Sequence, residues 1–169
     1  MALSSRELEV RAHLYADSRN IAIDMQLGYG NDGSVWMTNC KTAVKVERND
    51  EVFARELAAY SRLRELQVEQ IAGFWVPRLI DFEEDLWAIE MEIVSPPYLL
   101  DFGKAYLDRR PDFTSEVLAD WEAERRELFE ATQWPTVKKV LASLASLGIY
   151  YYDAKPGNIQ FAEESNDDS

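Results

Sequence analysis

Hydrophobic positions recur with two different periods in the first part of the chain. Residues 4–17 show the three-to-four-residue spacing of an amphipathic helix. Residues 21–46 consist of short apolar runs broken by Gly, Asn and Asp, which predict three strands joined in hairpins. Residues 51–66 return to the helical period and follow Asn49-Asp50, a pair that can cap a helix. These segments predict a helix, an antiparallel sheet and a second helix.

The pattern changes again after a second pair of strands. Residues 76–82 and 86–94 predict strands, and Ser95-Pro96-Pro97 ends the sheet because proline cannot donate to a strand ladder. Residues 115–131 and 136–147 then show the helical period. The chain is therefore predicted to be β-rich first and helical afterwards.

This order predicts an α+β fold in which residues 1–94 form one unit and residues 95–169 form another. Apolar residues make up 47% of the chain, enough for a packed core. One cysteine, Cys40, and one histidine, His13, argue against a disulfide, a Cys/His zinc site or a histidine-based triad. No apolar run approaches the roughly 20 residues that cross a bilayer, and no signal-peptide block is present. We therefore expect a cytoplasmic protein without a membrane partner.

The net charge of −13 disfavours nucleic-acid binding, because phosphates would be repelled. A nucleotide is a different case, since a local pocket can hold it. Gly28, Gly30 and Gly33 fit G-x-G-x-x-G and are followed by Val35. Glycines let backbone N–H groups approach phosphates closely. The same spacing occurs in dinucleotide-binding folds and in plain hairpin turns, but here residues 34–37 continue as a strand.

A lysine and a glutamate form a second candidate feature. In a strand, Ala43 and Lys45 share one face, which leaves room for a flat base beside a phosphate-binding cation. Glu56 falls within the apolar stripe of the helix predicted at 51–66, and a buried carboxylate needs a positive partner. Lys45 is the nearest candidate in chain order. The alternatives are that Lys45 faces solvent and that Glu56 reaches water at the stripe's edge.

Asp153, Lys155 and Asn158 form a third feature, after the last predicted helix. An aspartate can orient a hydroxyl and accept its proton, and a lysine can neutralise a transferring phosphoryl group. Asparagine can bind a metal through its side-chain oxygen. Pro156-Gly157 bends the loop so that these side chains can converge. The alternative is a polar turn between a helix and a strand.

These features, in this order, resemble the protein-kinase-like family, with a catalytic loop of the Ser/Thr-kinase type. The resemblance implies ATP bound between two lobes and metal-assisted transfer of its terminal phosphoryl group. It implies that Met91, Glu92 and Val94 lie at the adenine, that Lys45 pairs with Glu56, and that Asn158 binds Mg²⁺.

The chain departs from this family after Asn158, where no Asp-Phe-Gly follows. Asp101-Phe102-Gly103 precedes the catalytic loop, and we expect Asp101 to begin a helix or to meet a ribose hydroxyl rather than a metal. Asp167 and Asp168 are the other candidates. The alternative to an active phosphotransferase is a nucleotide-binding pseudokinase or an interaction module. The resemblance also implies a truncated second lobe, whose exposed apolar surface would bind a protein partner or a second copy.

Overall fold

The computed structural model describes residues 1–164 and confirms the α+β class. Its main sheet has five antiparallel strands in the order β1-β2-β3-β7-β6. The strands are β1 (Ile23–Tyr29), β2 (Gly33–Thr38), β3 (Thr42–Glu47), β6 (Leu79–Glu83) and β7 (Ala88–Glu92). All five were predicted from the apolar pattern. The last strand starts later than expected because Glu84–Leu86 form a 3₁₀ turn, η1.

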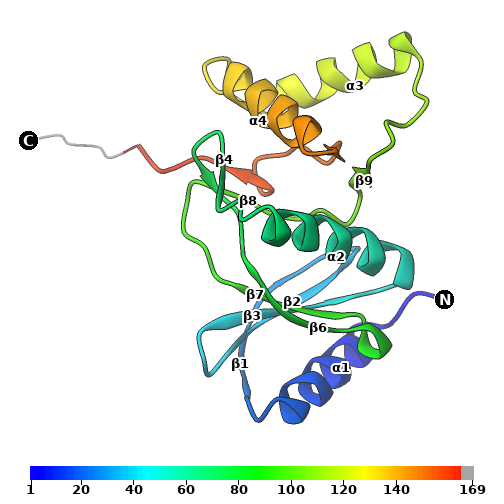
Figure 1. Cartoon of the computed structure of the whole chain (residues 1–169), viewed down its shortest axis with the longest axis vertical. Helices are drawn as coiled ribbons and strands as arrows, with labels where there is room; N and C mark the ends of the chain where they lie inside the picture. Colours follow the sequence, from blue (N-terminus) through cyan, green and yellow to red (C-terminus); the bar gives the residue numbers. More distant parts are fainter. Residues whose placement is uncertain (165–169) are drawn as a thin grey trace, which may run out of the picture.

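Two helices cover opposite faces of this sheet (Figure 1). Helix α1 (Ser5–Ser18) begins at a capping box formed by Ser4 and Glu7. Helix α2 (Asp50–Glu65) begins at Asn49, whose side chain accepts the N–H of Val52. Both helices lie where the period predicted them.

Alternation along β3 decides which side chains face which helix. Val44 and Val46 are fully buried in the cluster that includes α1, whereas Ala43 belongs to the larger core shared with α2. Lys45 therefore faces the same side as Ala43 and α2. The sheet thus presents its lysine to the helix that carries Glu56.

The described residues form six further short strands, five of which were not predicted; the exception is the strand that follows Asn158. A four-stranded sheet in the order β11-β8-β5-β4 joins distant parts of the chain, and a two-stranded sheet pairs β9 with β10. These strands are β4 (Gln70–Ile71), β5 (Phe74–Trp75), β8 (Tyr98–Leu99), β9 (Tyr106–Leu107), β10 (Ile149–Tyr150) and β11 (Ile159–Gln160). Each is two residues long, too short to show a period of two.

Helices α3 (Ser115–Glu127) and α4 (Trp134–Ser146) follow β9 and precede β10 in the chain (Figure 1). The prediction extended the first of them to residue 131, which is wrong because the chain turns at Leu128. The expectation that Asp101 begins a helix is also wrong. Asp101 has a left-handed backbone with φ of 66°, and no helix begins there. Among the described residues, no helix is long and apolar enough to span a membrane.

Candidate active site

A cleft of about 550 Å³ lies between the five-stranded sheet and the loops that carry Asp101 and Asn158. Residues from the turn between β1 and β2, from β3, from α2 and from the segment after β7 line it. Of the residues singled out in the sequence, it contains Gly28, Gly30, Gly33, Val35, Ala43, Lys45, Glu56, Met91, Glu92, Val94, Lys155 and Asn158. Asp153 lies beside it, in contact with Asn158.

The glycines at the mouth of the cleft differ in what they touch. The amide of Gly30 donates to the carbonyl of Gly33 at 2.9 Å, which closes the turn between β1 and β2. A methyl group at Gly33 would lie 2.3 Å from the backbone oxygen of Val46 on the neighbouring strand. At Gly28 and Gly30 it would meet no atom within 4 Å. Gly33 is therefore required by packing, whereas Gly28 and Gly30 have free space beside them at the edge of the cleft.

This difference gives a prediction about stability. Replacing Gly33 by alanine is expected to lower the free energy of unfolding by about 1–3 kcal/mol, because a backbone atom cannot move aside. The matched change Gly30→Ala should alter it by less than about 0.5 kcal/mol. Urea denaturation of the two variants measures both values. Equal losses would show that the close approach at Gly33 is relieved without cost.

Lys45 forms the expected ion pair with Glu56, and two further carboxylates join it. Its Nζ lies 2.6 Å from Glu56 Oε2, 3.0 Å from Glu47 Oε1 and 3.4 Å from Asp101 Oδ1. Glu47 is fully buried and Glu56 is 1% exposed. The position of Glu47 could have been inferred, since it shares a strand face with Ala43 and Lys45. The cluster therefore holds three acidic groups around one cation.

The cluster keeps Lys45 charged and leaves the acids in excess. Burial lowers the pKa of Lys45, but the carboxylates of Glu56, Glu47 and Asp101 outweigh it and hold this pKa well above its ordinary value. Burial, and then the negative charge of Glu47, raise the pKa of Glu56 well above its ordinary value. One oxygen of Glu56 and both of Glu47 lack a well-oriented hydrogen bond, although Glu47 Oε1 lies within ion-pair distance of Lys45. Uptake of a proton by Glu56 would relieve this repulsion.

The raised pKa of Glu56 predicts how stability depends on pH. Above the unfolded pKa of about 4.5, the folded state binds more protons than the unfolded state. Stability should therefore fall as pH rises from that value to the folded pKa, by at most about 1.4 kcal/mol per pH unit for one proton. Glu47→Gln should flatten this slope, because it removes the neighbouring charge. Urea denaturation between pH 4.5 and 8 measures it, and an unchanged slope would contradict the coupling.

The segment Asp101-Phe102-Gly103 lies inside this site, although it precedes the predicted catalytic loop in the chain. Strand β8 pairs antiparallel with β11, and the amide of Leu100 donates to the carbonyl of Asn158 at 2.8 Å. This pairing brings Asp101 to Lys45. A segment that precedes Asn158 in the chain thus lies beside the strand that follows Asn158.

The two residues after Asp101 fix the segment in position. The ring of Phe102 is fully buried between Tyr60 and Tyr151, with centroids 5.2 and 5.4 Å away. A methyl group at Gly103 would lie 2.5 Å from Val52 Cγ1, so the segment packs closely against α2. The carbonyl of Leu100 accepts the hydroxyl of Tyr151 at 2.8 Å. Asp101 is therefore held by packing on both sides.

The loop after β10 brings Asp153 and Asn158 together. The side-chain amide of Asn158 donates to the carbonyl oxygen and to the carboxylate of Asp153, at 2.9 and 3.1 Å. Lys155 Nζ lies 4.0 Å from the same carboxylate and is half exposed. The Asn158 amide oxygen remains available to a ligand. The loop therefore presents Asn158 and the ammonium group of Lys155 to the cleft, with the carboxylate of Asp153 beside it.

Three carboxylates converge where these parts meet. Oxygen atoms of Asp32, Asp101 and Asp153 lie within 4.8 Å of one another. Asp32 comes from the glycine-rich turn, and Lys104 binds it at 3.3 Å. Asp32 and Lys104 carried no recognisable signal in the sequence. Carboxylate and amide oxygens are the ligands that Mg²⁺ prefers, so this donor set fits the metal that the resemblance implies. Asp167 and Asp168 lie outside the described residues.

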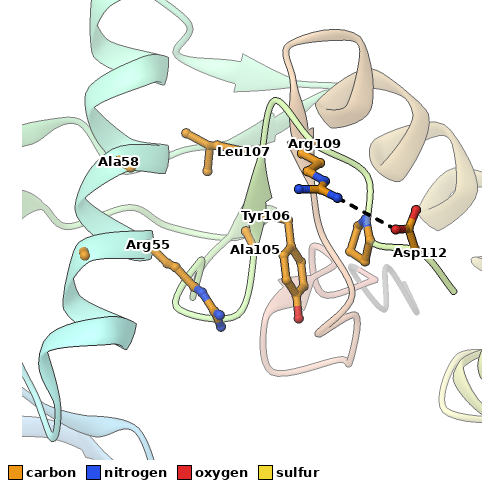
Figure 2. A pocket seen from close by; sticks show the side chains of 9 residues that line it. Arg55, Ala58, Ala105, Tyr106, Leu107, Arg109 and Asp112 are labelled. Carbon is orange, nitrogen blue, oxygen red and sulfur yellow. Dashed lines mark ion pairs between the residues drawn. The ribbon is translucent and has the colours of Figure 1, made fainter.

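A second cavity of about 500 Å³ lies between α2 and the segment around β9 (Figure 2). The guanidinium of Arg55 lies 5.1 Å from the ring centre of Tyr106, and Arg109 pairs with Asp112 at 3.8 Å. Both members of that pair are almost fully exposed. This cavity lacks the buried charges of the cleft, so the cleft is the candidate active site.

No protein-family model matches the sequence, and no curated protein matches it significantly. Among solved structures, the chain is similar to the streptomycin–ATP–APH(2″)-IIa ternary complex, with 19% identity and a TM-score of 0.40 over 82% of this chain and 42% of that one. It is also similar to ADP-bound aminoglycoside phosphotransferase APH(2″)-Ib, with 18% identity and a TM-score of 0.42 over 80% of this chain and 39% of that one. The chain thus spans about two fifths of those structures.

Proposed function

We propose that the chain binds ATP in the cleft and transfers its γ-phosphoryl group to a hydroxyl acceptor. One observation carries this proposal: the buried Lys45–Glu56 pair, Asp101 and the Asp153–Asn158 pair converge under a glycine-rich turn. A buried ion pair as a whole adds little net stability compared with apolar side chains in its place, so stability alone does not explain why these charged groups are present. Perturbed, converging charges in a cleft are typical of functional sites.

The nucleotide would lie with its base against the sheet. Ala43 leaves space on the strand face, and Val35, which lies opposite Lys45 on β2, is a partly buried apolar neighbour. The end of β7 and the segment after it line the cleft through Met91, Glu92 and Val94. The phosphates would then extend toward Lys45, beneath the turn that carries Gly28 and Gly30. Glu56 would hold the ammonium group of Lys45 in place for them.

Asp101 and Asn158, with Asp153 or Asp32 nearby, would hold Mg²⁺. The bound metal would supply neutralisation of the phosphate charge during transfer. Asp101 would then be the metal-binding aspartate, which no Asp-Phe-Gly after Asn158 supplies. This assignment favours an active phosphotransferase over a module that only binds a nucleotide.

The protein groups then account for the transfer itself. Asp153 would orient the acceptor hydroxyl and accept its proton as the new O–P bond forms. The bond between the γ-phosphorus and the bridging oxygen breaks, and ADP leaves with that electron pair. Lys155 would neutralise the charge on the moving phosphoryl group. The identity of the acceptor is not specified by these residues.

Binding and transfer can be tested separately. Mg-ATP at about 100 times its Kd should stabilise the protein by about 2.7 kcal/mol and raise its Tm by several degrees. Asp153→Asn should keep this shift and lower transfer to a panel of hydroxyl compounds about 10²- to 10⁴-fold. A normal shift without transfer by the wild type would instead support the nucleotide-binding module. No shift at millimolar ATP would contradict both.

A further inference from the structure

Two backbone carbonyls that flank Asp153 are bound by side chains from helix α3. The indole N–H of Trp121 donates to the carbonyl oxygen of Tyr152 at 2.9 Å, and an Nη1–H of Arg125 donates to that of Ala154 at 3.3 Å. A carbonyl bound to water can turn with its peptide unit, whereas one bound to a fixed protein donor is restrained. The peptide planes on both sides of Asp153 are therefore tied to α3.

The carbonyl of Asp153 itself accepts a bond from Asn158 at 2.9 Å. Three successive carbonyls in this loop thus bind side-chain donors, two of which come from one helix distant in the chain. Side-chain hydrogen bonds to the backbone are common in proteins, but here three of them fall on consecutive residues. The three hydrogen bonds, at residues 152, 153 and 154, restrain the backbone from which the carboxylate of Asp153 projects.

Helix α3 has no other buried anchor. None of its residues is fully buried, and Val117 is 48% exposed. Trp121 and Arg125 are four residues apart and so lie on one face of the helix. The Trp121 ring also packs edge-on against Tyr152, with centroids 5.4 Å apart. The face that meets the catalytic loop is therefore the one that carries an indole N–H and a guanidinium group.

Arg125 is held there at a cost. Its Nε is buried without a hydrogen-bond partner, although solvent is close by along the exposed part of the helix. A guanidinium group that served only solubility would turn outward and hydrate all five of its N–H groups. Its inward orientation is explained by the bond that Nη1 makes to the loop.

We propose that Trp121 and Arg125 are positioning residues for Asp153. They hold the two peptide units beside it, and with Asn158 they set the direction of the carboxylate toward the acceptor. The assignment rests on the proposed function for its catalytic consequence. The restraint on the loop is a property of the folded chain and is measured without turnover.

The test uses donor-deleting variants with matched controls. Trp121→Phe keeps a ring and removes the N–H, and Trp75→Phe makes the same change at an exposed tryptophan. Arg125→Met keeps the apolar stem, and Arg126→Met makes the same change at its exposed neighbour. Amide hydrogen exchange of residues 150–158 is the first measurement. We expect exchange to become about tenfold faster in each donor-deleting variant, as loss of one hydrogen bond implies, and to stay unchanged in the controls.

The second measurement separates positioning from binding. In both donor-deleting variants kcat should fall about 10- to 100-fold, because small misplacement of a reacting group is costly, while the Kd for Mg-ATP stays within about twofold. Arg125→Lys, which retains a donor, should recover part of kcat. A fall in kcat with unchanged Kd supports positioning.

Unchanged exchange of residues 150–158 in both donor-deleting variants would overturn the proposal. So would faster exchange spread over α3 and α4 alike, since that pattern indicates a structural role. If the wild type transfers no phosphoryl group but the loop loosens as expected, the proposed function fails and the restraint by α3 stands. If transfer occurs and neither variant changes kcat, the restraint has no catalytic consequence and the positioning role is wrong.

Discussion

Replacing Asp101 by asparagine is expected to lower phosphoryl transfer about 10²- to 10³-fold while ATP still binds. The carboxylate lies with those of Asp32 and Asp153 in the only acidic group of the described residues whose oxygens are placed to share a metal ion. A metal held there would contribute several kcal/mol of charge stabilisation, and each 1.4 kcal/mol corresponds to a factor of about ten in rate. The Mg²⁺ concentration for half-maximal transfer should rise as well.

The same change should not destabilise the protein. Asp101 is one of three carboxylates around Lys45, so neutralising it removes repulsion from Glu47 and Glu56. We therefore expect activity to fall while the free energy of unfolding stays equal or rises, as is common when a functional charge is removed. Asp112→Asn, at a 94% exposed carboxylate, is the matched control and should change neither. Transfer by Asp101→Asn within about threefold of the wild type would refute the metal-binding role.

The sequence predicted the elements that have a long local period. Helices α1 and α2 and the five strands of the main sheet each contain enough residues to show their apolar alternation. The Lys45–Glu56 contact was also predictable, because a carboxylate within an apolar helix stripe needs a cation. These inferences used neighbours within a helix or a strand, where spacing in the chain fixes the face.

The position of Asp101 could not be inferred in this way. It depends on β8 pairing with β11, two-residue strands that are close together only in the folded chain. Chain order predicted that Asp101 lies away from a metal, because this residue precedes Asp153. The structure shows that the order of the segments along the chain does not decide their order in space. The same holds for Trp121 and Arg125, whose hydrogen bonds join α3 to a loop that follows α4 and β10 in the chain.

Replacing Lys45 by methionine is expected to lower the free energy of unfolding by about 3–5 kcal/mol, besides abolishing ATP binding. The change leaves Glu47 and Glu56 buried without their cation, and an uncompensated buried charge is among the most destabilising defects in proteins. Lys104→Met is the matched control. That side chain lies in the same cleft but is half exposed, so its loss should cost less than about 1 kcal/mol.

Two further measurements identify the cause of this loss. The destabilisation by Lys45→Met should be smaller at pH 5 than at pH 8, because the raised pKa of Glu56 lets it take up a proton as the pH falls. The destabilisation should also be smaller in a Glu47→Gln background, because only one of the two buried carboxylates then lacks its cation. A double-mutant cycle detects this difference. Urea denaturation of the four proteins at both pH values gives all the terms. Equal losses in both backgrounds and at both pH values would mean that the destabilisation comes from lost side-chain packing, and that the carboxylates around Lys45 are screened by water.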